Sequence, residues 1–364
     1  MLQYPHLPTV IATTDPGALP WVQAEWQERC QAAGLNQPEV RRWSGQMRGV
    51  VFLSAQGPQP LLESQVLQMR TLHHVSRLIG RFELQHPNDL TTIEQAVAEA
   101  PLDELSLANS FRASCNRVGQ HDFDSYAVMV ATGKAVQERF GTPVDLKGYD
   151  LDVRVDVYEL EAWLGLQLTR KPLSHRFEGR PYLRRASLKS SVAYVLLQIA
   201  QITPESNGVL LDPFCGAGTI LLETGQLFPH LHLWGSDMHL EPVAGTETNL
   251  ALFGLQDRLS AQQVDARTLV EHYAPHSVDY LVTNPPYGLR MGHGIDIGVL
   301  YRRFLDGAKV VLKPEGTLVM LVLKAATLRA ALKASGDWRV DTHARLEIGG
   351  KMLTAFRLRL SKPA

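Results

Sequence analysis

The stretch that decides the fold is Asp212-Pro213-Phe214-Cys215-Gly216-Ala217-Gly218-Thr219, which stands between an apolar run at 208–211 and a segment with helical spacing at 219–227. A strand that leads through a glycine loop into a helix is typical of an open α/β sheet, in which ligands bind at the carboxyl ends of the strands. The loop has the form G-x-G, without the third glycine of the dinucleotide fingerprint or the Gly-Lys-Thr of a P-loop. Binding of dinucleotides or nucleoside triphosphates is therefore disfavoured.

The same alternation of strand and helix continues toward the C-terminus. Strand-like apolar runs lie at 231–235, 259–264, 278–283 and 317–323, and helix-like segments lie at 242–253, 267–273, 299–312 and 325–333. Strands that alternate with helices form a parallel sheet covered on both faces. Two further strand-like segments, 338–348 and 352–360, flank Gly349-Gly350 and predict an antiparallel hairpin at the sheet edge. We expect one doubly wound α/β domain over residues 191–364.

The N-terminal half has an α+β pattern. Strand-like runs at 9–12 and 49–53 flank helical spacing at 21–33, and this part is predicted as a module of residues 1–65. A second module, 66–169, is expected to contain a helical stretch at 67–78, a strand-like run at 105–115, a helix at 125–140 and a strand at 151–158. The last of these is predicted from its alternation of valines with charged residues, which has the period of two of a strand.

Residues 170–190 form a basic segment between the two halves. Its seven basic residues face a single acid, Glu178, and two prolines and a glycine interrupt any long element. The segment is predicted as a basic linker. It can contact phosphate groups, or it can be a solvated connection.

Composition excludes several classes of protein. The chain has 364 residues, with 36 Lys and Arg against 37 Asp and Glu, so any nucleic-acid site must be a local patch. Its cysteines, Cys30, Cys115 and Cys215, show no spacing typical of a disulfide framework or a zinc site. The N-terminus lacks the features of a signal peptide, and no apolar run reaches the roughly 18 residues of a membrane span. We expect a cytoplasmic monomer with neither metal nor membrane partner.

Polar residues also follow the later strands of the predicted sheet. Asp237 follows the second strand, Asp265 the third, and Asn284-Pro285-Pro286-Tyr287 the fourth. With Asp212 they point into one crevice, because the carboxyl ends of parallel strands share one edge. Asp212 can meet a cationic amine, Asp237 the two hydroxyls of a ribose and Asp265 the exocyclic amine of adenine. Each acid alone can equally cap the helix that follows it.

These residues resemble the class I S-adenosylmethionine-dependent methyltransferases. Asn-Pro-Pro-Tyr is similar to the motif of those members that methylate planar nitrogen atoms. The resemblance implies an S-adenosylmethionine site made of seven residues: Asp212, Gly216, Gly218, Thr219, Asp237, Asp265 and Asn284.

The motif also implies catalytic roles for Asn284, Pro285 and Tyr287. The lone pair of an exocyclic amine is delocalised, so acceptors must hold its N–H bonds while the lone pair meets the methyl group. The Asn284 side-chain oxygen and the Pro285 carbonyl can accept those bonds, and Tyr287 offers a face for stacking. Adenine N6, cytosine N4, guanine N2 and glutamine amides are all methylated through this motif.

The substrate is indicated by the N-terminal half. Residues 110–119 (SFRASCNRVG), with the helix around 131–135, resemble a THUMP domain, and residues 12–17 are similar to the ferredoxin-like subdomain that precedes THUMP. In that family the THUMP domain docks on the acceptor end of tRNA. The resemblance implies RNA contacts by Arg112, Arg117 and Lys134, and the basic linker adds Arg184 and Arg185.

Taken together, these features resemble the THUMP-containing tRNA guanine-N2 methyltransferases that act on guanine 6 of the acceptor stem. The chain departs from their pattern at Ser187–Ser191, where members often carry a proline. A methyltransferase of protein glutamine or of adenine N6 would leave residues 66–169 without an obvious purpose. A catalytically silent RNA-binding protein would not need Gly216, Gly218, Asp237 and Asn284 together. We therefore predict methylation of guanosine N2 in tRNA.

Overall fold

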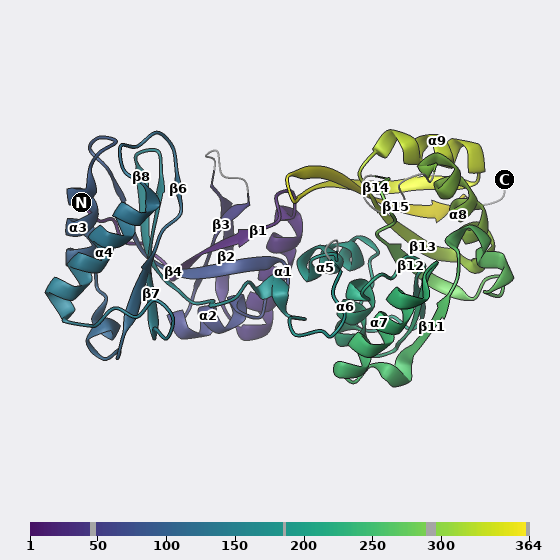
Figure 1. The fold of residues 1–364 in the computed structure, drawn as a ribbon, viewed down its shortest axis with the longest axis horizontal. Coiled ribbons are helices and arrows are strands. Elements are labelled where there is room, and N and C mark those ends of the chain that lie inside the picture. The colour runs from purple at the N-terminus through teal and green to yellow at the C-terminus, as the bar shows by residue number, and fades with distance from the viewer. Residues whose placement is uncertain (44–48, 185–186, 289–295, 362–364) are drawn as a thin grey trace. The chain divides into compact units, whose positions relative to one another are not determined.

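The chain divides into two compact units, each built around one β-sheet (Figure 1). The computed structural model describes residues 1–43, 49–184, 187–288 and 296–361. The first unit comprises residues 1–14 and 19–173, and the second comprises 15–18 and 174–364. No helix in these described ranges is long and apolar enough to cross a membrane.

The first unit begins with a ferredoxin-like arrangement. Its elements are β1 (Thr9–Thr14), α1 (Leu19–Ala33), β2 (Asn36–Arg42), β3 (Val50–Gln56), α2 (Gln59–Val66) and β4 (Leu72–Glu83). The strands are ordered β2-β3-β1-β4, and all of these neighbours pair antiparallel. This is the split β-α-β arrangement expected of a ferredoxin-like module.

The same sheet continues from β4 into the THUMP part. The elements here are α3 (Leu90–Glu99), a 3₁₀ turn at Asp103–Ser106, β5 (Phe111–Ser114), β6 (Arg117–Val118), α4 (Ser125–Phe140), β7 (Leu151–Tyr158) and β8 (Glu161–Gln167). β4 pairs antiparallel with β8, β8 pairs antiparallel with β7, and β7 pairs parallel with β5 and β6. One sheet therefore runs through both expected N-terminal modules, and their division at residue 65 stays a prediction.

The helix predicted at 67–78 is wrong, because most of that stretch belongs to β4. Leu72, Val75 and Leu78 are spaced by three residues, which imitates the apolar stripe of a helix. β4 is irregular on both edges: its pairing with β1 shifts register between Ala12 and Thr14, and its pairing with β8 shifts between Leu78 and Gly80. Such bulges interrupt the period of two that would reveal a strand. The strand predicted at 105–115 is also shorter than expected, covering only β5.

The second unit contains the predicted parallel sheet. Its elements are a 3₁₀ turn at Leu173–His175, α5 (Ser190–Ile199), β9 (Gly208–Asp212), α6 (Thr219–Leu227), β10 (Leu231–Asp237), α7 (Leu240–Leu252), a 3₁₀ turn at Gln256–Arg258, β11 (Leu259–Gln263), a 3₁₀ helix at Ala266–Glu271, β12 (Val278–Thr283), α8 (Ile297–Val311), β13 (Leu312–Val322), α9 (Ala325–Ser335), β14 (Trp338–Ile348) and β15 (Lys351–Leu360). The helix predicted at 267–273 is the 3₁₀ helix.

The strands of this sheet are ordered β11-β10-β9-β12-β13-β15-β14. The first five are parallel, whereas β15 is antiparallel to both β13 and β14, which confirms the predicted hairpin edge. Gly349 and Gly350, at the tip of the hairpin, both have positive φ, as a tight hairpin turn requires. The chain leaves β9 in one direction along the sheet and returns at β12 on its other side. Ligands of doubly wound sheets bind at that switch point.

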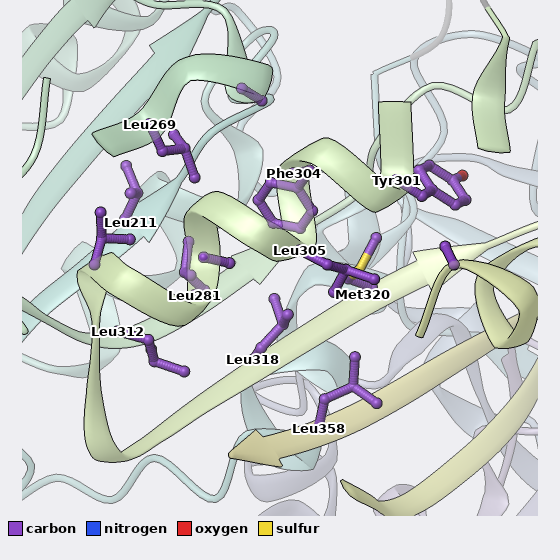
Figure 2. Packing of buried hydrophobic residues seen from close by; sticks show 14 of the residues in the cluster. Leu211, Leu269, Leu281, Tyr301, Phe304, Leu305, Leu312, Leu318, Met320 and Leu358 are labelled. Carbon is purple, nitrogen blue, oxygen red and sulfur yellow. The ribbon is translucent and has the colours of Figure 1, made fainter. Parts of the chain in front are cut away.

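A dense apolar core fixes these strand ends. Leu281, Leu318 and Met320 point from the sheet toward Phe304 and Leu305 of α8 (Figure 2), and all five are fully buried. Because side chains alternate along a strand, Leu210 and Val319, buried but outside this cluster, face the other side. There α5, α6 and α7 pack against the strands.

We expect Leu281→Ala to lower the free energy of unfolding by about 2–5 kcal/mol, since a buried leucine loses its contacts and leaves a cavity. Leu252→Ala is the matched control, because Leu252 is 57% exposed and its loss should change stability by less than about 0.5 kcal/mol. Urea unfolding followed by circular dichroism measures both. Equal losses in the two variants would contradict the packing described here.

Candidate active site

A cavity of about 500 Å³ lies at the carboxyl ends of the parallel strands. Its volume is typical of a site for a small molecule or cofactor. Asp212 and Asp237 line it as the last residues of β9 and β10, and Asp265 and Asn284 line it just after β11 and β12. The polar residues predicted to share one crevice do so.

Of the seven predicted cofactor residues, only Gly218 is outside the cavity lining; Gly216 and Thr219 line it with the four just named. Gly218 precedes α6 with a positive φ of 73°. A Cβ there would lie 3.0 Å from the side chains of Thr246 and Leu250 of α7. The absence of a side chain at Gly218 therefore allows the loop to pack closely against α7, which also contacts α6.

The glycine loop is held by buried hydrogen bonds. The Thr246 hydroxyl donates to the Gly216 carbonyl at 3.0 Å, and the Cys215 N–H donates to the Ser236 carbonyl at 2.9 Å. Burial raises the pKa of the Cys215 thiol far above its ordinary value, so the thiol stays protonated. Cys215 packs in the wall of the cavity as a small apolar group.

Asp212 is the most deeply buried acid of the site, with 2% of its surface exposed. It accepts hydrogen bonds from the Thr283 hydroxyl at 2.7 Å and from the Phe214 N–H at 3.2 Å. Burial outweighs these bonds and raises the pKa of Asp212 to about 7. A cation bound beside Asp212 would favour its ionised form.

The other two acids have local partners as well. Asp237 accepts from the N–H of His239 at 3.1 Å. Asp265 caps the 3₁₀ helix by accepting from the Arg267 N–H at 2.9 Å, and its hydrogen bonds with the Arg267 side chain hold the pKa of Asp265 below its ordinary value. Asp265 therefore both caps this 3₁₀ helix and lines the cavity.

The Asn-Pro-Pro-Tyr motif separates this cavity from a second one. Asn284 and Pro286 line the first cavity, whereas Tyr287 lines a cavity of about 350 Å³. The Tyr287 hydroxyl donates to Asn284 Oδ1, and the Tyr301 hydroxyl donates to the Pro286 carbonyl at 3.2 Å. Pro285 is buried within the motif. The second cavity is also lined by Asp296, Tyr301, Lys324 and Thr327.

The basic segment is more than a connection. From Ser174 onward it belongs to the second unit, and Arg184, Ser187 and Leu188 line the first cavity. The serines that replace the family's proline are engaged in hydrogen bonds: Ser187 Oγ accepts from the Arg184 N–H at 3.1 Å, Ser190 Oγ donates to the Ser174 carbonyl at 2.6 Å, and Ser191 Oγ donates to Asp15 Oδ2 at 2.7 Å. This segment is a wall of the cavity.

Sequence reasoning missed the residue that clamps this wall, Asn249 of α7. Its side chain is fully buried; Oδ1 accepts from the Tyr182 N–H at 3.1 Å, and Nδ2 donates to the carbonyls of Tyr182 and Ala217 at 2.8 and 2.9 Å. Asn249 lies three residues after Thr246 and one before Leu250, on the buried face of α7. The sequence could have indicated this role, because Asn249 lies on the apolar face of a predicted helix and a buried amide needs hydrogen-bond partners.

The RNA-binding candidates of the first unit have partners of their own. Arg112 forms an ion pair with Asp152 at 2.7 Å and lies 4.2 Å over the Tyr149 ring; Arg117 donates to the Gly119 carbonyl at 3.1 Å; Lys134 pairs with Glu94 at 2.9 Å. Arg184 lies in the cavity wall, and Arg185 lies outside the described residues. RNA contacts by these five residues stay predictions.

No group of three or more His, Cys, Asp and Glu that could hold a metal ion occurs in the part of the chain that the structure describes. A doubly wound sheet with a glycine loop and acids at successive strand ends is the arrangement of a class I methyltransferase. The chain matches the family described as RMKL-like, methyltransferase domain, over residues 178–354 and a THUMP domain over residues 87–167.

Known proteins agree with both matches. The tRNA (guanine(6)-N2)-methyltransferase of Thermus thermophilus is 37% identical over 83% of this chain and 88% of its own length. The crystal structure of TrmN from Thermus thermophilus has a TM-score of 0.80 and 32% identity, covering 97% of this chain and 99% of that one. SMU.472, described as "a putative methyltransferase complexed with SAH", shares the fold at 16% identity and a TM-score of 0.77, over 98% of this chain and 99% of that one. The chain belongs to the family of THUMP-domain methyltransferases represented by the Thermus enzyme.

The raised pKa of Asp212 predicts a fall in stability with rising pH. Between about pH 4 and 7 the folded protein holds a proton that the unfolded chain has released, so the free energy of unfolding decreases as the pH rises toward 7. Asp212→Asn keeps a carbonyl acceptor and cannot ionise, so it should lack this component. Thermal unfolding of both ligand-free proteins from pH 5 to 8 measures the difference. A difference that does not change with pH would contradict the assignment.

Proposed function

We propose that the protein transfers a methyl group from S-adenosylmethionine to N2 of a guanosine in tRNA, at guanine 6 of the acceptor stem. The observation that carries this proposal is the position of Asn284, which faces the first cavity while hydrogen-bonded to Tyr287 of the second. A methyl donor and an aromatic base can thus approach the same amide from two sides. The name of the Thermus relative and the THUMP match support guanine and tRNA as substrate.

The residues of the first cavity fit the cofactor. S-adenosylmethionine supplies a methyl group bound to a positively charged sulfur. Asp237 would accept from the ribose hydroxyls, Asp265 would accept from the adenine amine, and Asp212 would face the cationic amine. Asp212 is prepared for that role, because an adjacent positive charge lowers the pKa of a carboxyl and here would leave it ionised at neutral pH.

Asn284 and Pro285 would orient the reacting amine. The Asn284 oxygen has two lone pairs, of which the Tyr287 hydroxyl uses one, so the second can accept from an N–H of guanine N2. The Tyr287 bond fixes the rotation of the Asn284 amide, and the two prolines that follow it, of which Pro285 is buried, restrict the backbone. Such preorganised acceptors stabilise the transition state more than the bound substrate.

The second cavity is complementary to guanine. Guanine presents the N1–H and N2 amine as donors and O6 as an acceptor, whereas adenine presents an acceptor at N1 and a donor at N6. Asp296 supplies carboxylate acceptors, Lys324 supplies an ammonium donor, and Tyr287 and Tyr301 supply aromatic surface. We propose that this cavity receives the flipped base, since an enzyme that modifies a base must first take it out of the stack.

We further propose that the protein acts as a cytoplasmic monomer. Its three cysteines are free thiols, two of them buried, which suits a reducing compartment. The THUMP part would bind the acceptor end of tRNA.

The proposal predicts a single modified nucleoside. Unmodified tRNA transcript incubated with the protein and S-adenosylmethionine should yield N2-methylguanosine, detected by mass spectrometry of the digested RNA. A matched transcript with adenine at position 6 should stay unmodified. Methyladenosine in either transcript, or equal methylation of both, would contradict guanine 6 as the target.

Asn284→Ala should lower kcat by about 10²–10³ with little change in RNA affinity, because it removes an acceptor used in the transition state. Tyr287→Phe keeps the ring and loses only the bond that fixes Asn284, so kcat should fall by about tenfold or less. Single-turnover methylation and filter binding of tRNA give the two quantities. A wild-type rate for Asn284→Ala, or a parallel loss of RNA affinity, would remove Asn284 from catalysis.

A further inference from the structure

Arg180 is a half-buried cation at an electrostatically unfavourable place. Its Nη1 donates to the Thr219 hydroxyl at 2.9 Å, and its Nε is buried without a hydrogen-bond partner. The face of Phe177 lies 5.9 Å from the guanidinium. Among the described residues no carboxylate pairs with Arg180, and burial lowers its pKa. Even a half-buried charge loses hydration, and without an opposite charge this loss is not offset, so its position requires an explanation.

Arg180 contacts the N-terminal end of helix α6, which makes its position more unfavourable for a cation. Thr219 is the first residue of α6, where the helix dipole is positive and disfavours a cation. At the opposite end of α6, Arg258 donates to the carbonyls of Gly225, Phe228 and Leu231, with distances from 2.5 to 3.2 Å. Arg258 is a half-buried arginine whose donors are satisfied by the negative end of the helix. Arg180 lacks such acceptors, and an anion would supply them.

Thr219 indicates where that anion lies. Its side chain is 4% exposed and lines the first cavity. Since a guanidinium can only donate, Thr219 Oγ1 accepts from Arg180, and its own O–H remains free to donate. No acceptor for this O–H is present among the described residues. A hydrogen-bond donor, the Thr219 hydroxyl, therefore lines the cavity at the start of α6, in addition to the acidic residues at the strand ends.

We propose that Arg180 is a positioning residue for the carboxylate of the cofactor's amino-acid part: it holds the Thr219 hydroxyl so that Thr219 donates to that carboxylate, and its charge stabilises the bound anion. This inference rests on the proposed function, because it requires S-adenosylmethionine in the first cavity. It gives a role in the methyltransferase unit to a residue of the segment that was predicted as a basic linker.

The inference is tested by ligands that differ only in the carboxylate. S-adenosylhomocysteine carries it, and S-adenosyl-3-thiopropylamine, the decarboxylated analogue, does not. In calorimetric titration, Arg180→Met and Thr219→Val should each weaken binding of S-adenosylhomocysteine by about ten- to a hundredfold. Their affinity for the analogue should match that of the wild-type protein. Arg258→Met is the control, because Arg258 is also half-buried and its loss should not discriminate between the two ligands.

Folding is checked by the melting temperature of the ligand-free proteins. Arg180→Met replaces an unpaired cation with an apolar chain of similar length, so its melting temperature should equal or exceed that of the wild type. An equal loss of affinity for both ligands, or unchanged affinity for S-adenosylhomocysteine in Arg180→Met, would overturn the role of Arg180. A wild-type protein that binds neither ligand would instead overturn the proposed function itself.

Discussion

The buried amide of Asn249 is the constraint on which the site depends. Through three hydrogen bonds it joins α7, the glycine loop at Ala217 and both backbone groups of Tyr182. The loop approaches α7 closely at Gly218, and Tyr182 packs where a Cβ on Gly245 would collide with its ring. An amide left without partners in this position would lose about 1–3 kcal/mol for each unsatisfied group. The Asn249 side chain thus fixes the basic segment, which is one wall of the cavity, relative to the glycine loop.

The parallel sheet and its acids could be predicted from the sequence because both follow from local order along the chain. The strands β9 to β12 each end at, or within two residues of, a polar residue that lines the cavity, so the same stretch of sequence predicts both the strand and the site. Asp212 and Asp237 illustrate this, since each is the last residue of its strand. The terminal hairpin could also be predicted, because two glycines at its tip allow a turn that other residues resist.

The features that escaped prediction depend on partners distant in sequence. β4 looked helical because its bulges disturb the alternation, and its pairing with both β1 and β8 is visible only in three dimensions. β2 is an edge strand with few apolar residues, so its sequence lacks the alternation that predicts a strand. In the sequence, Arg180 and Arg184 form one charge run with their neighbours. Charge alone does not distinguish a basic residue that faces solvent from one that lines a cavity.

The two cavities on either side of Asn-Pro-Pro-Tyr explain why the motif alone cannot identify a substrate. The first cavity holds acids and a glycine loop suited to a cofactor, whatever nitrogen is methylated. The second is shaped by residues outside the motif, among them Asp296 just before α8 and Lys324 just before α9. If this cavity receives the base, as we propose, discrimination between guanine and other planar nitrogens would rest on side chains that the motif does not specify. Substrate choice could then change at those positions while Asn284 and the cofactor site remain the same, because the hydrogen bond from Tyr287 to Asn284 is internal to the motif.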